Sequence, residues 1–163
     1  MNTSSGFKLE FRIEFAHYAE ATLQAPCGTY VCRCIDSVDG LGLLAKDVVR
    51  MLNPPVACAA TKWEMDGQTL WVLDRRGDQI GINLIEFKET QQMLPSNRYA
   101  TVYQFSRCAF FASVDFIEFV AEVARAFGDL ETHGFDQDYD HWAQVYPSEQ
   151  VGKLRKFLRS IRQ

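Results

Sequence analysis

Residues 57–87 contain three apolar runs separated by two turn signals, a pattern typical of an antiparallel meander of three strands. The dipeptide Asp66-Gly67 favours a two-residue hairpin turn, and the stretch from Arg75 to Asp78 predicts a second turn. Successive side chains of a strand point to opposite faces, and the runs place apolar residues on both. At least one face of this sheet therefore needs a covering layer, which we expect to be helical.

Further strands flank the meander. Alternation of apolar and other side chains predicts strands over 7–15, 29–35 and 99–105, the last with an extension to 111 left open. Residues 16–28 show neither the strand period nor the helix period, so we expect a connection there, with one helical turn at most. Residues 88–98 are polar and include Pro95, which predicts a surface loop.

Three amphipathic helices are predicted, over 40–52, 114–127 and 147–162, from apolar residues that recur at spacings of three and four. Asn53-Pro54-Pro55 and Gly128 provide stop signals, and proline suits the first helical position. A chain of 163 residues is close to the usual size of one domain. The expected fold is a single α+β domain over 1–163, with a mostly antiparallel sheet of five or six strands, a central meander and about three packed helices.

Charge and hydropathy limit the classes of partner. The net charge of −4 disfavours direct binding of nucleic acid, which needs a basic surplus, and favours a basic protein partner. The sequence has neither a signal-peptide pattern nor an apolar run long enough to span a membrane, so we expect a cytoplasmic protein without membrane contact. Five cysteines, an odd number, are expected to be free thiols.

No pattern of an enzyme or of a cofactor site stands out. The chain has no G-x-S-x-G elbow, no phosphate-binding glycine loop and no H-E-x-x-H helix, so we expect neither catalysis nor a cofactor. Cys32 and Cys34, with Cys27 or Cys58, could form a zinc site, but a single residue separates the first two cysteines. We therefore expect Cys32, Cys34, Cys58 and Cys108 to be small buried thiols rather than metal ligands.

The aspartates of the segment FDQDYDHW offer two metal hypotheses. Asp136, Asp138 and Asp140 alternate as in a calcium loop, but His141 stands where that loop needs glycine and Pro147 where it needs glutamate. The same aspartates with His133 and His141 could instead form the centre of a metal-dependent enzyme, the main alternative to a binding function.

Negative charge is concentrated between Asp115 and Asp140, where eight carboxylates face the single cation Arg125. The last predicted helix is basic. A solvated acidic surface is one interpretation, and a surface for a basic protein, with aromatic anchors, is the other. The residues predicted to bind the partner are Glu118, Glu122, Asp129, Glu131, Asp136, Asp138, Tyr139, Asp140 and Trp142.

The C-terminal part of the chain carries the motif Y-P-x-E-x-x-x-K-L-R, formed by Tyr146, Pro147, Glu149, Lys153, Leu154 and Arg155. Together with the acidic helix and the aspartate-rich loop before it, this region resembles the small immunity proteins of bacterial contact-dependent inhibition and other polymorphic toxin systems. The resemblance implies a cytoplasmic antitoxin that binds a cognate toxin domain, often a nuclease, and blocks its active site. A structural or regulatory module that pairs through an exposed strand edge remains a further alternative.

A basic partner at the acidic segment has a measurable consequence. Replacing Asp136, Asp138 and Asp140 together by asparagine is then expected to leave folding intact, slow association and flatten its dependence on salt.

Overall fold

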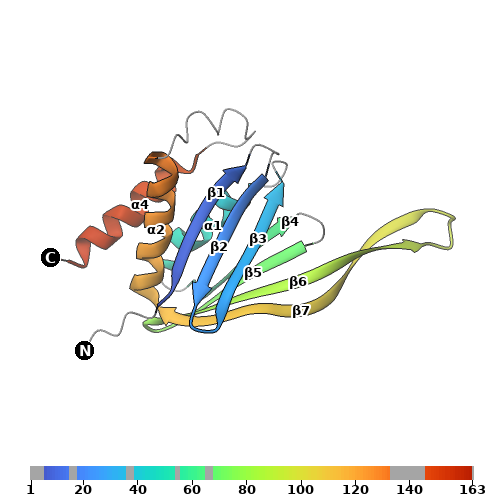
Figure 1. The fold of residues 1–163 in the computed structure, drawn as a ribbon, viewed down its shortest axis with the longest axis horizontal. Coiled ribbons are helices and arrows are strands. Elements are labelled where there is room, and N and C mark those ends of the chain that lie inside the picture. The colour runs from blue at the N-terminus through green and yellow to red at the C-terminus, as the bar shows by residue number, and fades with distance from the viewer. Residues whose placement is uncertain are drawn as a thin grey trace.

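The computed structural model describes residues 6–14, 18–35, 39–53, 56–64, 68–132 and 146–162, and it confirms the α+β class. The first antiparallel sheet has the order β1-β2-β3, with β1 at Lys8–Glu14, β2 at Tyr18–Ala25 and β3 at Gly28–Ile35. The second has the order β4-β5-β6-β7, with β4 at Cys58–Glu64, β5 at Gln68–Arg76, β6 at Gln79–Met93 and β7 at Tyr99–Asp115. The prediction of a single sheet with five or six strands is corrected to seven described strands in two sheets (Figure 1).

The predicted meander is confirmed, since β4, β5 and β6 are consecutive neighbours in the second sheet. Its buried face includes Trp63 and Trp71, whose ring centroids lie 5.2 Å apart. Helix α1, Gly40–Met51, packs against β4 on this face. Asp39 caps the helix, because its Oδ1 accepts a hydrogen bond from the backbone N of Gly42 at 2.8 Å.

Helix α2, Phe116–Thr132, packs against the edge strand β1, and helix α4, Ser148–Ser160, packs against α2. Phe127 of α2 meets Phe11 of β1, with ring centroids 4.8 Å apart. Polar groups of α2 also bond the strand edge. Leu9 N donates to Glu122 Oε2 at 3.3 Å, and Arg125 Nη2 donates to Leu9 O at 2.6 Å. These bonds protect part of an edge that could otherwise pair with another chain.

The three predicted helices are thus confirmed with shifted ends. The second begins at Phe116 rather than at 114, because β7 continues to Asp115 and Val114 is buried opposite Ile80. Asp115 then caps the helix, with Oδ1 accepting from Glu118 N at 3.0 Å. None of the described helices combines the length and the apolar character that a membrane span requires.

The prediction of a connection over 16–28 is wrong for most of its length, because Tyr18–Ala25 is the central strand of the first sheet. Ala19, Ala21 and Leu23 alternate with polar residues and are fully buried. Two of these three inward-facing residues are alanines, which differ little in hydrophobicity from their neighbours. The alternation that marks a strand is therefore hard to see in the sequence.

The predicted surface loop over 88–98 is also wrong. Strand β6 continues to Met93 and β7 begins at Tyr99, so only a short turn separates them. In this turn Leu94 N donates to Arg98 O at 2.8 Å, and Asn97 takes a positive φ of 56°. Residues 87–105 form a two-stranded hairpin that projects from the body of the protein, and we call it the arm (Figure 1).

The arm lies beyond the rest of the second sheet. Strand β5 ends its pairing with β6 at Gln68 and Phe87, and farther out β6 pairs only with β7 among the described strands. Two register shifts, between Leu84 and Ile85 and between Glu86 and Phe87, occur at its base. Such bulges increase strand twist, in agreement with the twisted hairpin of Figure 1.

Candidate protein-binding surface

The predicted acidic surface is described only in part. Asp136, Asp138, Tyr139, Asp140 and Trp142 lie outside the described residues, as do both histidines of the proposed metal centre, His133 and His141. The interface and metal hypotheses for this segment therefore stay predictions.

The other four predicted residues lie on α2, where cations of the same chain engage three of them. Arg125 donates to Glu122 at 2.9 Å and pairs with Asp129. Glu131 pairs with Arg155 of the basic helix α4. Glu118 lies in the first helical turn. Part of the negative charge of α2 is therefore paired with the basic helix α4, because the two helices pack together.

The cysteines do not assemble the zinc site considered above. Cys32 and Cys34 are buried on the inner face of β3, as expected, whereas Cys27, Cys58 and Cys108 are exposed. The predicted burial of Cys58 and Cys108 is therefore wrong. Within the described ranges, no three His, Cys, Asp or Glu side chains are grouped so that they could hold a metal ion. Burial raises the pKa of Cys34 to about 12 and raises the pKa of Cys32 well above its ordinary value.

The difference in burial between the cysteines predicts two classes of thiol reactivity. In the folded protein at neutral pH, Cys27, Cys58 and Cys108 are expected to react rapidly with a thiol reagent such as iodoacetamide, because they are exposed. Cys32 and Cys34 are expected to react only after denaturation. Mass spectrometry of the labelled peptides checks the assignment, and rapid labelling of Cys34 in the native protein would contradict it.

The arm has one face rich in large apolar side chains. Cross-strand partners share a face, and the pairs Phe87–Phe105, Glu89–Tyr103, Gln91–Thr101 and Met93–Tyr99 form this one. Tyr99 is 70% exposed, Phe105 66% and Met93 60%. We call these eight residues the aromatic face. The opposite face carries Lys88, Thr90, Gln92, Ala100, Val102 and Gln104.

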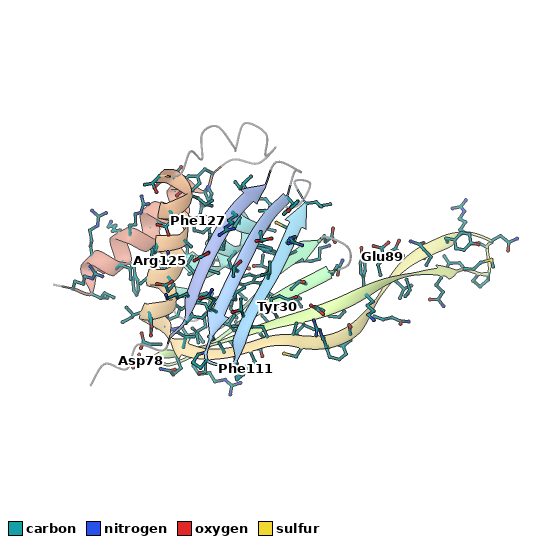
Figure 2. The ribbon with its side chains drawn as sticks, in the orientation of Figure 1. Tyr30, Asp78, Glu89, Phe111, Arg125 and Phe127 are labelled. Atoms are coloured by element: carbon teal, nitrogen blue, oxygen red, sulfur yellow. The ribbon has the colours of Figure 1, made fainter. Side chains whose placement is uncertain are left out.

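The polar residues of the aromatic face bond to one another. Gln91 Nε2 donates to Thr101 Oγ1 at 3.0 Å and to Glu89 Oε1 at 3.3 Å. Glu89 stands opposite Tyr103, so a carboxylate lies among the aromatic side chains (Figure 2). A cation of a partner could meet this carboxylate and the aromatic rings together.

The aromatic face continues onto the second sheet. On the side opposite Trp71 and Leu73, Val72 and Ile85 are half-buried and Phe111 is 57% exposed. The inner face, in contrast, is packed in the core with the described helices. Phe111 lies on β7 opposite Asn83, in the body of the second sheet (Figure 2).

The exposed rings of this surface add up to a sizeable apolar area. With 150–250 Å² per aromatic side chain, the exposed parts of its four most accessible rings amount to roughly 450 Å². These rings belong to Tyr99, Tyr103, Phe105 and Phe111. A patch of several hundred Å² on one protein commonly marks an interface, and a standard interface buries about 800 Å² per partner. The aromatic face with Phe111 could therefore supply much of the apolar area of one such contact.

A second feature lies at the base of the arm, where Glu86 is held from two sides. Its Oε1 accepts from Tyr30 Oη at 2.7 Å, and its Oε2 accepts from Arg107 Nε at 2.7 Å. The bond from Arg107 lowers the pKa of Glu86, and burial raises the pKa of Tyr30. A charged carboxylate and a neutral phenol thus join β3 to the hairpin at neutral pH.

The lowered pKa of Glu86 predicts a pH-dependent contribution to stability. A carboxylate with a lowered folded-state pKa stabilises the fold above its unfolded-state pKa, and the effect is lost as the pH falls through the folded-state value. Replacing Glu86 by glutamine is expected to reduce the free energy of unfolding by a constant amount above about pH 6. Below the ordinary pKa of 4.5, the difference from the unsubstituted protein should shrink. Urea unfolding over a pH series checks this, and a difference that grows in acid would contradict it.

Sequence reasoning identified the strand at 99–105 but not the surface that it helps to form. The signal was present, because Tyr99, Tyr103 and Phe105 alternate with smaller or polar residues. The partner strand carries mainly polar residues, and it therefore resembles a loop.

Comparisons of the chain with models of protein families, with curated proteins and with solved structures returned no match.

Proposed function

We propose that this protein is a non-catalytic inhibitor of the immunity type, which binds a cognate bacterial toxin domain of the nuclease class through the arm. The aromatic face is the observation that supports a protein-binding function. The hairpin projects from the body and leaves the side chains of Met93, Tyr99 and Phe105 largely exposed. Burial against another protein would remove their apolar surface from water.

The net charge of the whole chain, rather than that of the arm, which carries Lys88 and Arg98 against Glu89, suits a basic partner. Glu89 lies among aromatic rings, and the whole chain carries a net charge of −4. A toxin nuclease needs a basic cleft to hold phosphate groups, and an acidic inhibitor is attracted to the same field. In this proposal the long-range charge speeds the encounter in the cytoplasm, and the aromatic side chains of the arm hold the complex together.

The function can be tested by co-expression in bacteria with a candidate toxin domain, and the adjacent upstream gene is the place to look for one. The protein is expected to restore growth and to co-purify with that domain. A catalytically inactive toxin variant serves as the control that separates binding from rescue of growth. If the protein neither restores growth nor binds the inactive domain, the proposed inhibitor function is wrong.

A further inference from the structure

A groove of about 350 Å³ lies at the base of the arm. One wall is the stretch of β3 from Tyr30 to Arg33, and the rest includes Gln68 and Thr69 of β5 and β6 from Glu86 to Lys88. Strand β3 is the last strand of its sheet, and among the described strands it pairs with β2 alone. The groove therefore follows a strand edge, near Tyr30 in Figure 2.

The register of the β2–β3 hairpin shows which main-chain groups point into the groove. Ala25 and Gly28 flank a two-residue turn, so they form the first hydrogen-bonded pair of the ladder. Hydrogen-bonded pairs alternate with open pairs along an antiparallel ladder, so Tyr30 and Cys32 also direct their N–H and C=O groups at β2. Val31 lies between them. Its N–H and C=O groups therefore point away from β2, toward the groove.

The lining of the groove is polar. Small-molecule sites are mostly apolar with a few polar groups, whereas hydroxyl, amide and charged side chains dominate here. They belong to Tyr30, Arg33, Gln68, Thr69, Glu86, Lys88 and Ser106. Such a lining suits a polypeptide main chain, which carries a donor and an acceptor at nearly every residue.

The charges of the lining indicate which type of side chain a bound peptide segment would place in the groove. Arg33 and Lys88 are the cations, and Glu86 is the carboxylate. Glu86 already accepts hydrogen bonds from Tyr30 and Arg107. Arg33 is paired with Glu20 at 2.8 Å, so the exposed Lys88 is the cation that an aspartate or glutamate of the segment would meet.

We propose that this groove binds an extended, carboxylate-bearing peptide segment of a partner protein, which adds as a strand to the edge of β3 at Val31. Main-chain hydrogen bonds to Val31 hold the segment, and Lys88 pairs with its carboxylate. The inference rests on the protein-binding function proposed above and gives it a second contact, at the base of the arm.

The test uses the full chain and a phage-displayed library of linear peptides of about eight residues, somewhat longer than a typical strand. Enriched peptides are expected to contain Asp or Glu and to slow the hydrogen exchange of the Val31 amide, measured by NMR. Val31→Pro removes the outward N–H without removing a bond to β2, and it should weaken peptide binding about tenfold. Val31→Thr keeps the N–H and should bind as the unsubstituted protein does.

Lys88→Glu is a second variant that does not alter the strand edge. It is expected to weaken the same peptides about tenfold, so the proposal remains testable if Val31→Pro does not fold. Failure to enrich any peptide, or peptides that protect amides of the arm tip instead of Val31, would overturn it. No toxin domain takes part in this test. A failure here, together with retained toxin binding, would therefore refute the groove and leave the inhibitor function standing.

Discussion

Replacing Phe127 by alanine is expected to lower the free energy of unfolding by about 3–5 kcal/mol, the usual cost of removing a fully buried phenylalanine. The Phe127 side chain is completely buried and lies between Phe11 of β1 and Tyr146, at centroid distances of 4.8 and 6.1 Å. It thus joins the first sheet, α2 and the segment that leads into α4. The cavity would weaken all three contacts together. Urea unfolding followed by circular dichroism measures the loss.

A matched control uses the same substitution on the arm. Phe105 is 66% exposed, so Phe105→Ala should change the free energy of unfolding by no more than about 0.5 kcal/mol. Equal losses for the two variants would show that Phe105 contributes to the core as much as Phe127 does, which would contradict the account of the arm.

The second large effect is expected in binding. Replacing both Tyr99 and Phe105 by serine should weaken the complex with the inactive toxin domain at least about 100-fold, because aromatic anchors of an interface often contribute about 2 kcal/mol or more each. The fold should remain intact, since both side chains are largely exposed. Isothermal titration calorimetry measures the affinity, and unfolding curves verify the fold.

The control for this pair lies on the opposite face of the same hairpin. Gln92→Ser with Gln104→Ser changes two exposed positions of the arm without touching the aromatic face. Its affinity should stay within about threefold of the unsubstituted value, as expected for residues outside the anchors. If both double variants bind equally well, the aromatic face is not the contact surface.

The sequence was most informative where one face of an element is strongly apolar. The meander and the three helices bury large side chains at regular spacing, and this spacing of apolar residues made the elements predictable from the sequence. Strand β2 escaped detection because Ala19 and Ala21 give little contrast with their neighbours. The outer half of β6 escaped because it covers no core, so burial imposes no period on residues such as Thr90, Gln91 and Gln92.

The candidate surface was harder to predict than the fold. Composition drew attention to the acidic residues, but Glu122 and Asp129 pair with Arg125 of their own helix. Glu131 pairs with Arg155, which is 24 residues away in the sequence. Which charges remain available to a partner depends on the packing of α2 against α4. The aromatic face likewise depends on the cross-strand register, which places Met93 beside Tyr99 and Phe87 beside Phe105.

The most direct test of the arm as the contact surface is amide hydrogen exchange of the protein alone and in complex with the inactive toxin domain. We predict strong protection of residues 87–105 in the complex, with little change over the exposed side of α2. Protection of α2 with unchanged exchange in the arm would contradict the account and favour the acidic surface as the site of docking.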